Sequence, residues 1–167
     1  MSKLFTVLKY LVFSVLFLAI SCSSNSSKNK QLESGERSVE EIYNSAMNYI
    51  NDNKFITAHG EFIEVERLHP YSIWATRAQI MTSYVNYKLD KYADSVSGAE
   101  RYIELHPGAN DIDYAFYLIA LNYYEQINDY RRDQSFTGKA LEAFKNLIRR
   151  FPDSDYARDA KLKLDLV

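Results

Sequence analysis

Apolar residues recur at intervals of three and four along most of the chain that follows residue 38. Three such series are Phe55, Ala58, Phe62, Val65; Phe116, Ala120, Tyr123, Ile127; and Ala140, Phe144, Leu147, Phe151. This spacing places the side chains on one face of an α-helix. Ser38 followed by Glu41 has the pattern of a capping box, which marks the start of a first helix. The pattern therefore predicts a succession of amphipathic helices.

The three prolines of the chain lie in the same local context. Each closes a helical stretch, in the segments 61–70, 98–107 and 143–152, and the prolines are 37 and 45 residues apart. A recurring context with a period in this range indicates a helical solenoid, and the tetratricopeptide repeat has a period of about 34 residues. We therefore test the sequence against that repeat.

The residue types of the tetratricopeptide repeat fall in register with the prolines. Small residues occur where the two helices of a pair touch, and large residues occur where they fill the space between helices. In the second repeat, Ser95 replaces the usual alanine. A one-residue slip of the first helix of that repeat is the alternative register. An enlarged loop is expected between Ile127 and Lys139. The predicted fold is all-α: a superhelical tetratricopeptide solenoid over residues 39–167, with three helix pairs (39–72, 73–109, 110–153) and a terminal helix (154–167).

The N-terminal segment 1–21 has the pattern of a signal peptide. Eleven uncharged residues, Tyr10 to Ile20, follow two lysines, which is too short for a membrane-spanning helix. Small residues then precede Cys22, as in a lipobox, so we expect Cys22 to carry fatty-acid chains such as palmitate. Residue 23 is serine and not the aspartate that resembles an inner-membrane retention signal, so we expect the protein on the outer membrane, facing the periplasm. Residues 22–38 are polar, and we expect them to form a flexible tether. An ordinary secretory signal with a bystander cysteine is the alternative.

Composition narrows the function classes further. A formal net charge of −2 argues against a nucleic-acid partner, and a single cysteine excludes an internal disulfide and a cysteine-rich zinc site. None of the nucleophile, zincin or phosphate-loop motifs occurs, so we expect no enzyme activity, no metal and no cofactor beyond the lipid. His69 and His106 precede equivalent prolines and are interpreted as repeat signature. His59 and Glu61 lie on different sides of their helix and do not converge.

The concave face, built from the first helix of each pair, is the candidate binding surface. The repeat register places many of the chain's 14 tyrosines there, and a tyrosine side chain combines apolar area with a hydrogen-bonding tip. The repeat register assigns the following residues to a peptide-binding groove: Tyr43, Met47, Ile50, Tyr84, Tyr87, Tyr114, Tyr117, Leu121 and Tyr124. It also assigns Arg77, Ile80, Lys88 and Glu125 to this face. Many of these tyrosines could instead pack between helices, since a solenoid uses both sides of its inner helices.

From Tyr43 to Leu164 the chain resembles the BamD family, the tetratricopeptide lipoproteins of the outer-membrane barrel assembly machinery. The segments that carry the resemblance are 65–75, 105–117, 130–134 and 151–157, together with the lipobox and the polar tether. The family normally has five repeats, whereas this chain ends in the fourth. The resemblance implies that the chain keeps the repeats that receive substrate and lacks much of the part that docks to the barrel-forming subunit.

This resemblance implies a lipid-anchored periplasmic scaffold. Its partners would be barrel assembly subunits and unfolded outer-membrane protein precursors, whose insertion it would aid. The alternative is an envelope adaptor that binds folded partners in cell division or peptidoglycan coordination. Such adaptors usually have a trimerising coiled coil before the repeats, and no such heptads precede Ser38.

Overall fold

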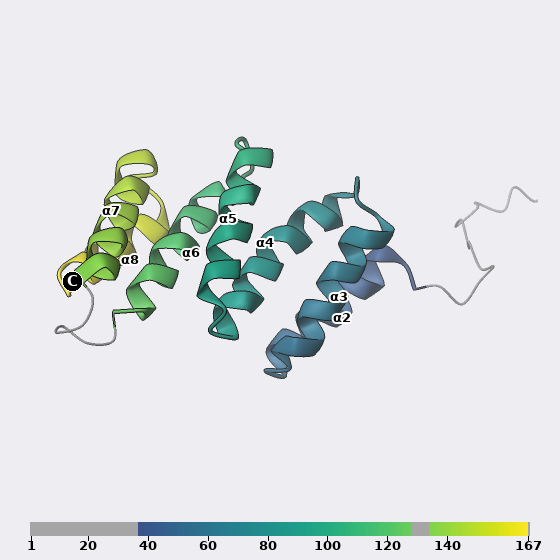
Figure 1. Cartoon of the computed structure of the whole chain (residues 1–167). Helices are drawn as coiled ribbons and strands as arrows, with labels where there is room; N and C mark the ends of the chain where they lie inside the picture. Colours follow the sequence, from purple (N-terminus) through teal and green to yellow (C-terminus); the bar gives the residue numbers. More distant parts are fainter. Residues whose placement is uncertain (1–36, 128–133, 167) are drawn as a thin grey trace, which may run out of the picture. The chain divides into compact units, whose positions relative to one another are not determined.

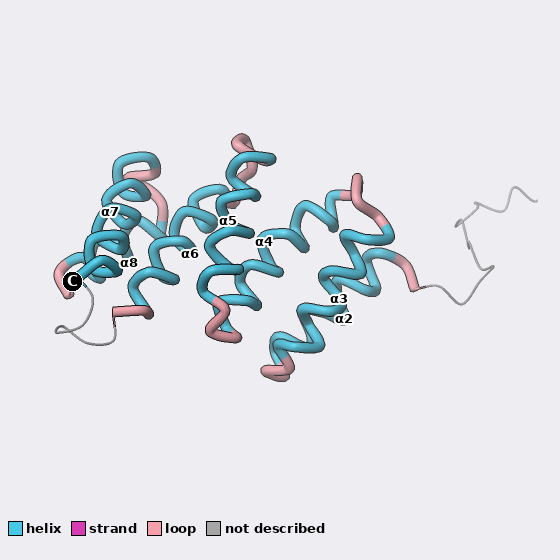
Figure 2. Tube along the Cα trace, in the orientation of Figure 1, coloured by secondary structure: helices cyan, strands magenta, loops and turns pink. Residues whose placement is uncertain are grey.

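The computed structural model describes residues 37–127 and 134–166, which form seven α-helices without a strand (Figures 1 and 2). They are α2 (Val39–Asn51), α3 (Phe55–Leu68), α4 (Ile73–Lys88), α5 (Tyr92–Leu105), α6 (Ile112–Glu125), α7 (Gln134–Arg150) and α8 (Asp155–Leu164). None of these helices is long and apolar enough to cross a membrane. The predicted signal peptide, Cys22 and the tether up to Glu36 lie outside the described residues.

The helices form two rows that differ in how their members meet. Every helix packs against its neighbours in the chain, and α2, α4, α6 and α8 also pack against one another in sequence order. The helices of the other row, α3, α5 and α7, make no such contacts with one another. We call α2, α4, α6 and α8 the inner row, and α3, α5 and α7 the outer row. The predicted fold, three helix pairs and a terminal helix, is confirmed.

Serine side chains cap the N-termini of three of the inner helices, α2, α4 and α8. The hydroxyls of Ser38, Ser72 and Ser154 each accept a hydrogen bond from the third backbone amide of the following helix. Ser38 and Glu41 form the predicted capping box, with both bonds present. In the turns within the first two pairs, Asn53 and Asp90 have φ of 58° and 59°, a left-handed conformation that asparagine and aspartate tolerate. Local sequence therefore fixes the turns as well as the caps.

Small residues lie at the crossing of each helix pair. These pairs occupy the same repeat positions, and each of their side chains is at most 1% exposed: Ala46 with Ala58, Ser83 with Ser95, and Ala120 with Ala140. Such side chains allow the two helix backbones to approach closely. Large side chains fill the space beside each crossing, and their order changes between repeats. Phe62 and Phe144 correspond to Ala99, and the lost volume is restored one turn later by Tyr102, which is 2% exposed.

The expected loop between Ile127 and Lys139 is shorter than the sequence suggested, because α7 already begins at Gln134. Phe136 is partly buried in this first turn and extends the apolar stripe of Ala140 and Phe144 towards the N-terminus. The Lys139 ammonium lies 5.3 Å from the Phe136 ring centroid and 5.7 Å from that of Tyr123. These contacts favour helix over loop at a place where Gly138 alone would favour a break.

The middle of the domain contains a buried polar network. The Ser95 hydroxyl donates to the carbonyl oxygen of Ser83 at 2.8 Å and accepts from the Asn122 amide at 2.8 Å. The same amide nitrogen donates to the Leu118 carbonyl at 2.7 Å. The network joins α4, α5 and α6 at the crossing where the flanking repeats carry alanine in place of Ser83 and Ser95. The two bonds of the Ser95 hydroxyl fix the positions of α4, α5 and α6 relative to one another, because a buried polar group left unpaired is costly.

The hydroxyl of Ser83 also accounts for Gly98. A Cβ at position 98 would lie 2.3 Å from Ser83 Oγ, so the serine occupies the space that an alanine side chain would need. We predict that Gly98→Ala lowers the free energy of unfolding by about 1 to 3 kcal/mol. The double variant Ser83→Ala with Gly98→Ala should return to within about 1 kcal/mol of wild type, since alanine favours helix over glycine. Urea unfolding followed by Trp74 fluorescence measures both. A single variant as stable as wild type would contradict the steric account.

Candidate functional site

A cleft of about 540 Å³ opens on the inner row. Side chains from α2, α4, α6 and α8, or next to them, line it: Tyr43, Arg77, Ile80, Met81, Asp111, Tyr114 and Tyr156. Its walls are therefore built by successive inner helices, which only the stacking of four repeat units brings together. The volume is within the range of about 300 to 1,000 Å³ that is usual for ligand sites.

Aromatic contacts hold the N-terminal wall of the cleft in place. The Tyr43 ring packs edge-on against Phe62 at 5.5 Å and against Trp74 at 4.9 Å between centroids. The guanidinium of Arg77 lies 5.2 Å from the Trp74 ring, a cation–π contact at the solvent-facing edge. Burial raises the pKa of Tyr43, so its hydroxyl stays neutral and can donate a hydrogen bond. The wall presents an apolar ring beside an exposed positive charge.

Tyr114 and Tyr156 form the opposite wall, and Tyr117 packs against Tyr156. Tyr156 of α8 packs against Tyr114 at 5.2 Å and stacks on Tyr117 at 5.1 Å between centroids. The Tyr117 hydroxyl donates a hydrogen bond to the carboxylate of Asp159, which ties α6 to α8. Burial, followed by the surrounding tyrosines, raises the pKa of Tyr114 well above its usual value. This wall is preformed, because ring packing and a charged hydrogen bond restrict its side chains before any ligand arrives.

Tyr87 lies in a separate hollow of about 300 Å³, with Lys88, Asp90, Tyr92 and Glu125. Its hydroxyl donates to Glu125 Oε1 at 3.2 Å. Burial, with the negative charge of Glu125 and this hydrogen bond, raises the pKa of Tyr87 to about 12. The hollow is polar and carries both signs of charge. It therefore differs in chemistry from the cleft.

The structure separates the groove residues assigned from the sequence into three sets. Tyr43 and Tyr114 line the cleft together with Arg77 and Ile80. Tyr84, Tyr87 and Tyr117 lie near Tyr114 and contribute to its raised pKa. The others pack into the cores between helices: Met47, Ile50, Leu121 and Tyr124. Tyr124 contacts Phe144 at 6.0 Å, and the Lys163 ammonium lies 5.3 Å from its ring. Cys22 lies outside the described residues.

The sequence assignment missed Met81, Asp111, Tyr156 and Asp159. For α8 a signal was available: residues 37 or 45 apart occupy equivalent repeat positions, and Asp159 then corresponds to Arg77 and Tyr114. The repeat register in the sequence analysis assigns no groove residue to this terminal helix. In the structure it packs against both α6 and α7 and completes the inner row. Asp111 precedes α6 and accepts from the Tyr102 hydroxyl at 2.5 Å, which no periodicity indicates.

The histidines of the described residues do not form a reactive site. His106 Nε2 lies 2.9 Å from the amide oxygen of Gln79, a contact between neighbouring repeats. Within residues 37–127 and 134–166, no group of three histidine, cysteine, aspartate or glutamate side chains is arranged to hold a metal ion.

Helix pairs stacked in two rows, with a cleft along the inner row, define a class of protein: helical repeat scaffolds, which bind other molecules on an extended inner face. A solved structure of MamA from Desulfovibrio magneticus shares the fold. The two align with a TM-score of 0.55 at 19% identity, over 77% of this chain and 67% of that one. At this identity the likeness concerns the fold alone.

Residues 35–167 match the model of the YfiO family, described as outer membrane lipoprotein, and the chain belongs to this family. Curated relatives are named outer membrane protein assembly factor BamD. The relative from Caulobacter vibrioides is 43% identical, over 79% of this chain and 43% of its own length. The relative from Rickettsia prowazekii is 35% identical, over 77% of this chain and 51% of its own length. The relative from Neisseria gonorrhoeae is 30% identical, over 93% of this chain and 63% of its own length.

The resemblance to the BamD family is therefore confirmed, and family membership associates the chain with the outer membrane. The relatives carry the name of an assembly factor, not of an enzyme. The matched region spans about half the length of these relatives.

The raised pKa of Tyr87 gives a prediction for alkaline pH. The folded state favours the neutral hydroxyl, with a pKa of about 12 against an ordinary 10.0, so the resulting stability is fully present below pH 10.0 and is lost as pH rises through about 12. We predict that the free energy of unfolding falls less steeply across this range in Tyr87→Phe than in wild type. Denaturant unfolding at successive pH values measures the two slopes. Parallel curves would contradict the prediction.

Proposed function

We propose that this chain is a lipid-anchored scaffold on the periplasmic face of the outer membrane, which binds segments of unfolded outer-membrane protein precursors and aids their insertion. Barrel assembly subunits would be its other partners. Family membership and the names of the relatives support the role in assembly. The observation that carries the binding role is the tyrosine-walled cleft of about 540 Å³, because it opens on the inner row, the face on which helical repeats bind other molecules.

The cleft suits an extended segment with an aromatic side chain at its end. Tyr43 and Tyr114 offer ring surfaces on opposite walls, with the nearly buried Ile80 between them. Arg77 is exposed at the same opening and no ion pair with it is present within the described residues, so it can receive a terminal carboxylate. Tyrosine walls tolerate different sequences, since each ring combines apolar contact with one hydrogen-bonding group. Tyr84 and Tyr117, which lie near Tyr114, would flank this core contact.

A peptide that carries an outer-membrane protein C-terminus ending in phenylalanine tests this proposal. We expect the full chain to bind it, and Arg77→Gln to weaken binding about tenfold through loss of the charged hydrogen bond to the terminal carboxylate. Amidation of the peptide's terminus should weaken binding to wild type similarly and leave binding to Arg77→Gln unchanged. Arg101→Gln is the matched control, because Arg101 is exposed on the outer row. Equal binding of the peptide and a scrambled version would contradict the proposal.

The proposed anchor at Cys22 has its own test. Each buried methylene contributes about 0.8 kcal/mol, so two or more acyl chains hold a protein stably on a membrane. We predict that Cys22→Ser removes the protein from the outer-membrane fraction of fractionated cells, whereas Ser23→Ala leaves it there. Recovery of Cys22→Ser in the outer-membrane fraction, resistant to a carbonate wash, would show that the anchor lies elsewhere.

A further inference from the structure

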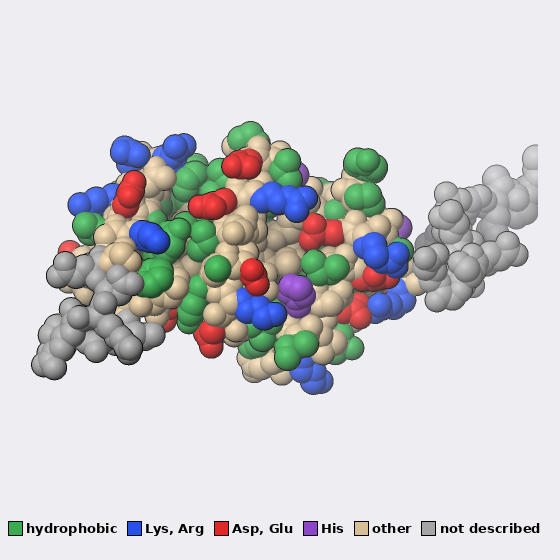
Figure 3. Space-filling view, viewed as in Figure 1, with side chains coloured by type: hydrophobic (Ala, Val, Ile, Leu, Met, Phe, Trp, Pro, Cys, Tyr) green, Lys and Arg blue, Asp and Glu red, His purple; other side chains and the backbone are tan. Residues whose placement is uncertain are grey.

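The outer row contains a hollow that the inner cleft does not explain. It lies between α5 and α7, has a volume of about 550 Å³, and exposes part of α6 between them. Its floor is apolar and partly exposed: Ile103 from α5, Phe116 and Ile119 from α6, and Ala143 from α7. Figure 3 shows hydrophobic side chains gathered between these two outer helices. Partly exposed apolar side chains gathered in a recess favour a binding surface over ordinary solvent exposure.

The same gap one repeat earlier, between α3 and α5, has a different chemistry. The residues that stand 37 positions before Ile103, Phe116 and Ile119 are Glu66, Gln79 and Thr82. Glu66 faces the Gln79 and Thr82 side chains, and His106, directly after α5, contacts the Gln79 amide oxygen at 2.9 Å. At the later junction the counterpart of this last contact is aromatic, with Phe116 and Phe151 at 5.5 Å between centroids. Between α3 and α5 the polar side chains bond to one another, whereas the hollow between α5 and α7 leaves apolar side chains partly exposed.

The two edges of the hollow carry opposite charges. Glu100 and Glu104 line the edge on α5, and Arg150 lines the edge on α7. The three side chains are exposed, and none of them forms an ion pair within residues 37–127 and 134–166. The hollow is therefore electrostatically asymmetric, with a negative edge on α5 and a positive edge on α7 on either side of an apolar floor.

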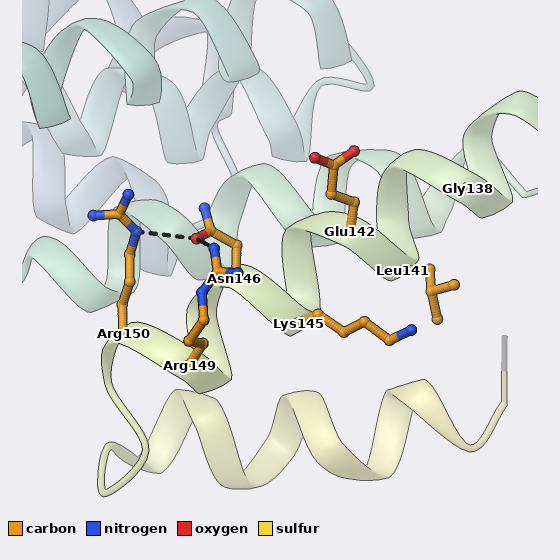
Figure 4. A pocket seen from close by; sticks show the side chains of 7 residues that line it. All are labelled: Gly138, Leu141, Glu142, Lys145, Asn146, Arg149 and Arg150. Carbon is orange, nitrogen blue, oxygen red and sulfur yellow. Dashed lines mark hydrogen bonds between the residues drawn. The ribbon is translucent and has the colours of Figure 1, made fainter.

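The positive edge is held in position. The guanidinium groups of Arg149 and Arg150 both donate to the side-chain oxygen of Asn146, each at 3.0 Å (Figure 4). Arg150 also lies 5.1 Å from the Phe116 ring centroid, at the margin of the floor. Beyond it, Lys145 and Arg149 border a second recess of about 450 Å³ along α7. A charge fixed by hydrogen bonds and ring contact loses less conformational entropy on binding than a free side chain does.

We infer that this hollow binds an amphipathic helix of a partner protein, with basic residues along the edge that faces α5 and acidic residues along the edge that faces α7. A helix satisfies its own backbone groups, whereas an extended segment on this apolar floor would leave amides unpaired. Glu100 and Glu104 are four residues apart on one helix face, which matches lysines four apart on a neighbouring helix. This binding mode is independent of the cleft on the inner row.

Synthetic helical peptides of about 15 residues test the inference, each with a leucine face. One peptide has lysines on one flank and glutamates on the other, a second has lysines on both flanks, and a third has glutamates on both. We expect the full chain to bind the mixed peptide about threefold to tenfold more tightly than either uniform one at low ionic strength. Arg150→Glu makes both edges acidic, and its preference should change to the all-lysine peptide. Lys54→Glu, at the turn of the first helix pair, should keep the wild-type preference.

The apolar floor has a separate test that uses the repeat itself. Ile119→Thr installs the residue of the preceding repeat, and we expect it to weaken binding of the mixed peptide about tenfold, while Ile63→Thr on α3 leaves binding unchanged. Circular dichroism monitors folding, and Arg150→Glu remains informative if Ile119→Thr does not fold. Failure of the folded wild-type chain to bind any of the peptides would overturn the inference. Self-association that Arg150→Glu abolishes would also overturn it, since the hollow would then take a second copy of this chain.

Discussion

The close crossing of the two helices in each pair is the constraint on which the rest of the structure depends. At each crossing two small side chains meet, Ala46 with Ala58 in the first pair and Ala120 with Ala140 in the third. Their size brings the helix backbones together, and the larger residues on either side then fill one continuous core. A helix pair alone could not bury its apolar face, so each pair requires the next. The inner row, its cleft and the gaps of the outer row follow from that stacking.

The repeat explains why the fold could be predicted from sequence while the site could be predicted only in part. Helix positions follow from periodicity, capping serines and prolines, all of which are local features. The cleft depends on which side chains of different helices meet, and here Tyr156 and Asp159 of α8 were decisive. Tyrosines that look equivalent along the inner row have different surroundings: Tyr43 lines the cleft, whereas Tyr124 packs against Phe144. Only the packed structure distinguishes these cases.

Departures from the repeat carry more information than agreement with it. The serine at position 83 requires glycine at 98, and the serine at position 95 brings a buried hydrogen-bond network with Asn122 to the middle of the domain. The isoleucine at 119, where the preceding repeat has Thr82, makes part of the floor of the outer-row hollow apolar. The two faces thus differ in chemistry: aromatic and preformed on the inner row, apolar with charged edges on the outer row. An assembly scaffold would benefit from such a division, because an extended segment and a folded partner could bind at the same time.

Isoleucine methyl groups provide the most direct measurement of which face receives an extended segment. Ile80 lies in the cleft and Ile119 in the outer hollow, so each reports on one surface. In a methyl-labelled protein titrated with the phenylalanine-terminated peptide, the account predicts that the Ile80 signal shifts and saturates while the Ile119 signal stays unchanged. A saturable shift of Ile119 with an unchanged Ile80 would contradict the assignment of the inner row as the peptide-binding face.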